Sequence, residues 1–137
     1  MTVSALIEPA ALAARLADDN LVIFDASWHM PAAARSGRAE YEAAHIPGAL
    51  FFDIDAISDR ATDLPHMLPS ESDFAAAMCA AGVGNDSDIV VYDAHGLFSA
   101  ARAWWMLRAF GHERVSVLNG GLPAWRAAGL PLSSDAE

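Results

Sequence analysis

Two short apolar runs, each ending at an aspartate, constrain the fold of this chain more than any other feature. The first is Leu21–Asp25, and the second is Ile89–Tyr92 with Asp93 directly after it. Continuous apolar runs of this length predict strands buried on both faces, as in a parallel sheet. A further strand is predicted over Val115–Leu118 and a shorter one over Leu50–Ile54.

Helical segments alternate with these strands, which predicts an α/β layer structure. The best marked helix is Ser70–Ala81, because Ser70 can cap its start and Gly82 follows its end. The other predicted helices cover residues 8–18, Ala100–Phe110 and Pro123–Ala128.

The predicted helix Ala100–Phe110 has no clean polar face, since Arg102 and Arg108 are its only charged residues. A helix that is apolar nearly all round is usually buried on more than one side. It is therefore either the central helix of a single domain or a helix that meets a second domain.

Composition excludes several classes of function. The chain has 137 residues, enough for one domain, and its net charge of -10 argues against nucleic acid as a partner. No apolar run approaches the roughly 18 residues of a membrane span, and we expect no secretory leader. The single cysteine excludes an internal disulfide and fits the cytoplasm. The five histidines are widely spaced, so neither a metal nor another cofactor is predicted.

Three segments, taken in order, resemble a known family. Together they resemble rhodanese domains, and most closely the N-terminal domain of thiosulfate and 3-mercaptopyruvate sulfurtransferases. The likeness runs from about Leu21 to Leu132. The segments that carry it are Asp25–Trp28, then Glu40–Asp53 with its His-Ile-Pro-Gly-Ala core, then Val90–Asp93 with Arg102–Trp105, Val117–Gly121 and Trp125.

The resemblance implies a rhodanese-like three-layer α/β fold, in which a central, mostly parallel sheet of about five strands carries helices on both faces. It also implies that residues 1–132 form one domain. The remaining residues, 133–137, are small and polar, and they are expected to begin an interdomain linker or to form a disordered tail.

Two connectors within these segments have a structural explanation of their own. In the connector 45–49, Pro47 helps to end the preceding helix, Gly48 can take a positive φ, and His45 could bond backbone groups and hold the turn. The Asn-Gly-Gly sequence at 119–121 resembles a phosphate cradle but lacks its glycine spacing and lysine, so a turn is favoured.

The same resemblance predicts that this chain has no catalytic residue. Active members carry sulfur on a cysteine at the end of the strand that matches Ile89–Tyr92, and here that position holds Asp93. A carboxylate cannot accept sulfur as a thiolate does. Active domains often have a substrate-binding arginine two residues after the aspartate that matches Asp25, and here that position is Ser27. Cys79 lies near a helix end without a basic neighbour and is expected to be structural.

What the chain could still contribute is part of a groove wall. By resemblance, Trp28 and Phe98 would line the groove that the catalytic cysteine of a second domain faces, although each could equally anchor its own loop. The implied partner is a C-terminal catalytic rhodanese domain of the same protein, with thiosulfate or 3-mercaptopyruvate as sulfur donor. Two alternatives remain: a stand-alone inactive rhodanese module for protein binding or regulation, and an enzyme that uses Asp93 and His95 as acid–base groups.

Overall fold

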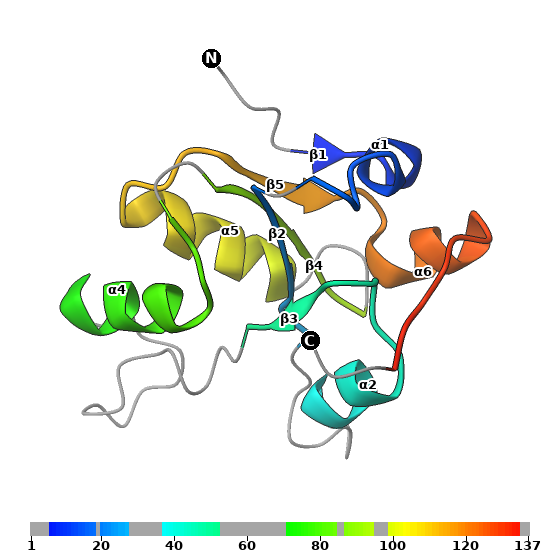
Figure 1. Ribbon diagram of the computed structural model, residues 1–137, viewed down its shortest axis with the longest axis horizontal. Helices are drawn as coiled ribbons and strands as arrows, with labels where there is room; N and C mark the ends of the chain where they lie inside the picture. The colour runs from blue at the N-terminus through cyan, green and yellow to red at the C-terminus, as the bar shows by residue number, and fades with distance from the viewer. Residues whose placement is uncertain are drawn as a thin grey trace.

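The computed structural model describes residues 6–18, 20–27, 37–52, 71–84, 87–94 and 99–134 (Figure 1). Strands and helices alternate along these segments, as the apolar runs and helical segments predict. In chain order the elements are β1 (Leu6–Ile7), α1 (Pro9–Ala13), β2 (Leu21–Asp25), α2 (Gly37–Ala43), β3 (Leu50–Phe51), α4 (Glu71–Ala80), β4 (Asp88–Tyr92), α5 (Ser99–Ala109), β5 (Val115–Leu118) and α6 (Gly121–Ala127).

The strands form one five-stranded sheet in the order β1-β5-β4-β2-β3. Every neighbouring pair is parallel, with Ile23 opposite Val90 and Val91 opposite Val117 in the two central pairs. The predicted parallel sheet of about five strands is confirmed. Its central strand, β4, is buried along Ile89–Tyr92, which explains the uninterrupted apolar run there.

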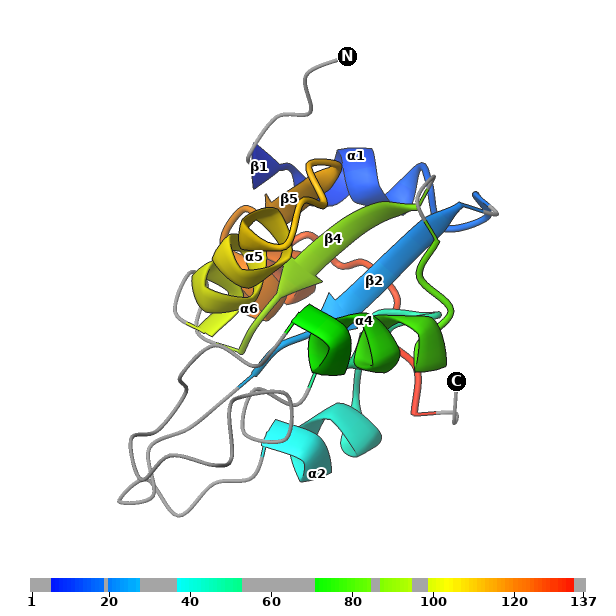
Figure 2. The same ribbon diagram turned by 90° about the vertical axis from the view of Figure 1, so that its left-hand side faces the viewer.

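Helices cover both faces of this sheet (Figures 1 and 2). Successive side chains of a strand point to opposite faces. Ile89 and Val91 of β4 therefore join one core cluster with residues of α4 and α5. Val90 and Tyr92 join a second cluster, which contains residues of α1 and α6. These two cores make the structure three-layered, as predicted.

Helix α5 buries one side against the sheet through Ala103, Met106 and Leu107. Its other side carries two arginines stacked over tryptophans, with Arg102 5.1 Å from the ring of Trp105 and Arg108 5.2 Å from that of Trp104. Trp105 is 45% exposed. The helix is therefore buried most deeply on the side that faces the sheet, and the mixture of arginines and tryptophans on its other side explains why no clean polar face is visible in the sequence.

At the amino edge of the sheet, a small ion-pair network surrounds the first residue of β4. Arg15 Nη2 donates to one carboxylate oxygen of Asp88 (2.8 Å), and Arg114 Nε donates to the other. These interactions hold the pKa of Asp88 below its usual value. The network joins the segment after α1, the start of β4 and the segment before β5.

The connector between α2 and β3 has the predicted turn structure. Gly48 takes a φ of +84°, a left-handed conformation that glycine adopts without strain. The buried His45 donates from Nδ1 to the carbonyl oxygen of Tyr41 (2.7 Å). Its backbone also pairs with Ser133 in an antiparallel bridge, with N–H to O distances of 2.8 and 2.7 Å. His45 thus holds both the turn and the C-terminal segment.

The C-terminal segment is further fixed by Trp125, whose Nε1 donates to the carbonyl oxygen of Pro131 (2.7 Å). Ser133 therefore contacts the domain directly. The predicted boundary, with the domain ending at residue 132, stays a prediction.

Several elements differ from the sequence-based expectations, among them α6, which begins at Gly121 rather than Pro123, and α2, which the sequence indicates only through the turn at Pro47. Strand β1 was not predicted, because two residues give no local signal and its pairing partner, β5, lies far along the chain. Helix α1 ends at Ala13 rather than residue 18, since residues 14–18 form tighter turns that bring Arg15 to Asp88. Strand β3 covers Leu50–Phe51, and residues 53–54 of the predicted strand lie outside the described residues.

Candidate functional site

The carboxyl ends of β2 and β4 lie side by side, because the two strands are parallel neighbours in register. Asp25 at the end of β2 is opposite Tyr92 at the end of β4. Ser27 follows the first strand end, and Asp93 and Ala94 follow the second. In open α/β sheets, this edge is where ligands bind. The two aspartates that end the apolar runs are therefore brought together at one end of the sheet.

Asp25 is only 2% exposed, yet its carboxylate has several hydrogen-bond donors. The backbone N–H of Ser27 donates to Oδ1 (2.9 Å), and the hydroxyls of Ser27 and Tyr92 also bond the carboxylate. Burial raises the pKa of Asp25, and these hydrogen bonds only partly offset that rise. The result is a carboxylate held in place by dipoles rather than by a cation.

Tyr92 links this carboxylate to the α2–β3 connector. Its ring is completely buried, and its hydroxyl accepts the backbone N–H of Ile46 (3.2 Å) while bonding Asp25. Burial raises the pKa of Tyr92 well above its usual value, so the hydroxyl stays neutral. One phenol therefore holds the end of β2 and the start of the connector in fixed positions.

Asp93 is fully buried and ties β4 to the two helices that follow. Its Oδ2 accepts the N–H of Ala100, in the first turn of α5, at 2.8 Å. Its backbone carbonyl accepts the N–H of Leu122, in α6, at 2.9 Å. The carboxylate thus satisfies one of the N–H groups that a helix start leaves without an intrahelical partner.

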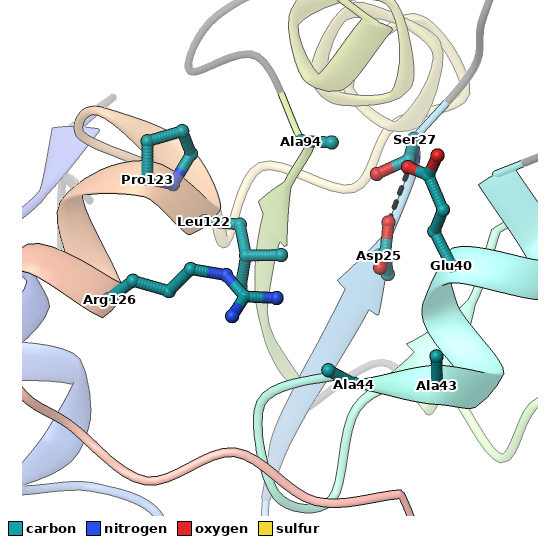
Figure 3. Close-up of a pocket in the computed structure, with 9 residues that line it drawn as sticks. All are labelled: Asp25, Ser27, Glu40, Ala43, Ala44, Ala94, Leu122, Pro123 and Arg126. Atoms are coloured by element: carbon teal, nitrogen blue, oxygen red, sulfur yellow. Dashed lines mark hydrogen bonds between the residues drawn. The ribbon is translucent and has the colours of Figure 1, made fainter. Parts of the chain in front are cut away.

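A pocket of about 370 Å³ opens beside these strand ends (Figure 3). Helix α2 comes close enough to form one wall because Gly37 lies directly against the carbonyl of Ser27, where any side chain would collide. Helix α6 forms the opposite wall. The lining residues are Asp25, Ser27, Glu40, Ala43, Ala44, Ala94, Leu122, Pro123 and Arg126.

Charged groups of opposite sign stand on the two walls of this pocket. Glu40 extends from α2 beside Asp25 and Ser27, and the guanidinium of Arg126 extends from α6 into the space between the helices (Figure 3). The sequence analysis gave neither residue a role: Glu40 only opens the segment Glu40–Asp53, and Arg126 belongs to no motif. Only the fold brings the two helices together.

The structure describes only one of the four residues Trp28, Phe98, His95 and Cys79, which were considered from the sequence. Trp28 and Phe98, the expected groove-wall residues, lie outside the described residues, as does His95. Cys79 is exposed on α4, which covers the face of the sheet opposite α6. It does not line the pocket.

The remaining sequence-based predictions concern a turn and the histidines. The predicted turn covers Asn119 and Gly120, with Gly120 at a φ of +79°, and Gly121 is already the first residue of α6. His112 Nε2 donates to the carbonyl oxygen of Ser87 (2.9 Å). Within the described ranges, no three His, Cys, Asp or Glu side chains gather in a way that could hold a metal ion.

Comparison with known proteins assigns the chain to a family. Residues 8–128 match the model of the rhodanese-like domain. The chain is 58% identical over 126 residues to a mitochondrial thiosulfate/3-mercaptopyruvate sulfurtransferase of Arabidopsis thaliana, covering 92% of this chain and 33% of that protein. It is 52% identical to human 3-mercaptopyruvate sulfurtransferase, covering 90% of this chain and 42% of that protein.

Solved structures agree with this result. The crystal structure of a 3-mercaptopyruvate sulfotransferase from Escherichia coli superposes with a TM-score of 0.92 at 46% identity, over 98% of this chain and 52% of that one. The chain therefore spans about a third to a half of the length of these relatives. Among the described residues, no helix is long and apolar enough to cross a membrane.

Proposed function

The chain belongs to the rhodanese-like domain family, and we propose that it is the non-catalytic, N-terminal domain of a sulfurtransferase. In this proposal the parent protein moves sulfane sulfur from thiosulfate or 3-mercaptopyruvate to a thiophilic acceptor. The sulfur travels as a persulfide on a cysteine of a C-terminal catalytic domain. The names of the relatives and the share of their length that this chain spans support it.

Asp93 is the observation that carries the proposal. A sulfur nucleophile in this family works at the end of the strand equivalent to β4, where helix N–H groups stabilise a thiolate or persulfide. Here the Asp93 carboxylate is completely buried at that strand end and bonds the Ala100 N–H. It therefore uses a donor that a sulfur anion would need, and it has no sulfur to transfer.

Two further features support an inactive domain. Ser27 stands where active members often have a substrate-binding arginine, and its N–H is engaged by Asp25. Cys79 lies on α4, on the opposite face of the sheet from α6. A cysteine there cannot exchange sulfur with a substrate held at the strand ends.

The contribution of this domain to the parent enzyme would be structural. By resemblance, Trp28 and Phe98 form part of the apolar wall of the groove that the catalytic cysteine faces, where exclusion of water limits persulfide hydrolysis. The cytoplasm is the proposed compartment, on the basis of the single cysteine. The name of one relative places that protein in mitochondria.

The test is a sulfurtransferase assay on the purified chain, with thiosulfate or 3-mercaptopyruvate as donor and cyanide as acceptor. Intact-protein mass spectrometry then looks for the added mass of one sulfur atom. An active rhodanese serves as positive control, and Cys79→Ser serves as the matched variant. We expect no turnover and no adduct with either donor.

Turnover that disappears in Cys79→Ser would contradict the proposal, because sulfur would then be carried on α4. The sequence of the parent gene beyond residue 137 separates the proposal from a stand-alone inactive module. A catalytic cysteine loop downstream supports the two-domain enzyme, and a stop codon near residue 137 supports the module.

A further inference from the structure

The pocket beside the carboxyl ends of β2 and β4, called here the carboxyl-edge pocket, is lined by acidic residues and by the basic Arg126. This combination of charges suggests a ligand. We propose that it binds a small zwitterion of the α-amino acid class, whose carboxylate pairs with Arg126 and whose ammonium group faces Asp25 and Glu40. This goes beyond the proposed function and does not depend on it, since neither sulfur transfer nor a second domain enters the reasoning.

Arg126 supplies the anion-binding side. It is an exposed residue of α6, and its side chain extends across the pocket toward the opposite wall (Figure 3). Within the part of the chain that the structure describes, its guanidinium forms no hydrogen bond or ion pair. A guanidinium offers donors in a fork that matches the two oxygens of a carboxylate. The donors of Arg126 are therefore available to a ligand.

Asp25 and Glu40 supply the cation-binding side. Asp25 is held rigidly at the pocket floor by the N–H of Ser27, and Glu40 is half-buried on α2 beside it. Burial raises the pKa of the Asp25 carboxyl, so an approaching ammonium group would stabilise its charged form. The carboxylates of the pocket floor and of the α2 wall provide several acceptor oxygens for the N–H groups of an ammonium.

The combination of charges excludes simpler ligands. A lone anion that reaches Arg126 would meet the repulsion of Asp25 and Glu40, whereas a lone cation would meet Arg126. A compact zwitterion satisfies both walls at once. The volume of about 370 Å³ is near the lower end for ligand pockets, and Ala43, Ala44 and Ala94 leave room for a small side chain only.

The first experiment is a two-dimensional NMR titration of the full chain with L-alanine, alongside two half-ligands. Propionate carries the carboxylate without the ammonium, and ethylamine carries the ammonium without the carboxylate. We expect L-alanine to shift the amide signals of residues around the pocket and to saturate. Each half-ligand should bind at least about tenfold more weakly, because it leaves one wall unpaired.

Two variants test the two walls, each with a matched control. Arg126→Gln and Glu40→Gln should each weaken L-alanine binding by about tenfold. Arg108→Gln on α5 and Glu42→Gln on α2 remove the same charges outside the pocket lining and should leave binding unchanged. Circular dichroism of every variant checks that the fold is retained.

Several outcomes would overturn the proposal. They are the absence of saturable shifts near the pocket with L-alanine, equal affinity for a half-ligand, or unchanged affinity in Arg126→Gln. Loss of binding in the two control variants as well would also overturn it, because that result indicates a general charge effect. None of these outcomes bears on the sulfurtransferase assay, so the two proposals can fail separately.

Discussion

At the amino edge of the sheet, Asp88 sits between two arginines in a partly exposed ion-pair network, whereas at the carboxyl edge Asp25 is buried and accepts hydrogen bonds from neutral donors. The two edges shift carboxyl pKa values in opposite directions. The arginines hold the pKa of Asp88 below its usual value, and burial raises the pKa of Asp25. Asp88 is thus stabilised in its charged form by ion pairs with arginines, whereas Asp25 relies on hydrogen bonds in a buried position.

The two edges also differ in where the cation that could pair with each carboxylate lies. At the amino edge the cations are in place, so the network is complete and needs no ligand. At the carboxyl edge the donors to Asp25 are the N–H of Ser27 and two hydroxyls, and the nearby cation, Arg126, stands across a pocket. The second edge therefore combines rigid acceptors with a pocket that has space for another molecule.

The largest expected effect comes from Asp93, which is completely buried. Asp93→Ala removes the acceptor for the Ala100 N–H and should lower the free energy of unfolding by about 2 kcal/mol. Urea denaturation measures it. Asp93→Asn retains an acceptor oxygen and should lose clearly less. Equal losses in both variants would show that the negative charge, rather than the hydrogen bond, is what α5 requires.

A smaller loss is expected from Tyr92→Phe, which removes one hydroxyl and keeps the buried ring. The change takes a partner from both Asp25 and the Ile46 N–H, and it should cost about 1.5 kcal/mol in unfolding free energy. Amide hydrogen exchange at Ile46 should become faster. Tyr41→Phe is the control, since its hydroxyl bonds the carbonyl of Ala49 instead. Unchanged exchange at Ile46 would argue against this role of Tyr92.

Asp88→Asn should cost less, below about 1 kcal/mol at pH 7, because both arginines are partly exposed and screened by solvent. The folded-state pKa of Asp88 is lowered. Its contribution is therefore present above the unfolded pKa of about 3.9 and is lost as the pH falls through the folded value. Urea denaturation across this range should show the variant and the unsubstituted chain converging in acid. A difference that grows in acid would contradict the sign.

The smallest expected effect concerns Asp25, for which the dependence of unfolding free energy on pH should have the opposite sign to that for Asp88. Its folded-state pKa is raised, so the protonated form contributes stability that is present below the unfolded pKa of about 3.9 and is lost as the pH rises through the folded value. Relative to Asp25→Asn, the unsubstituted chain should therefore lose stability as the pH rises from acid. The same series of urea titrations measures it. If the unfolding free energy instead changed with pH in the same direction as for Asp88, the two edges of the sheet would not differ in the way described.

Much of the fold follows from local sequence signals. The buried strands β2, β4 and β5 were predicted within about a residue, because continuous apolar runs are bounded there by polar residues or glycine. Strand β1 was missed, since Leu6–Ile7 is defined only by pairing with β5. Helix α1 was predicted too long, because alanine content indicates helix but cannot report that Arg15 must turn toward Asp88.

The site was less predictable than the fold. The position of Asp93 at a strand end could be predicted, because it follows an apolar run, and so could the turn held by His45. The pocket could not. Glu40 and Arg126 are ordinary charged residues of two helices, and nothing in their neighbourhoods shows that the helices face each other. The roles of Trp28 and Phe98 stay predictions.

The place of β1 in the sheet has a consequence for how the chain is made on the ribosome. Glu8, just after β1, bonds Asn119, just after β5, and the two are 111 residues apart. At about 5 to 20 residues per second, translation therefore leaves the first strand waiting roughly 6 to 20 seconds for its neighbour. Through that interval the backbone of β1 has no native strand partner, so this side of the sheet is completed only after β5 has been made.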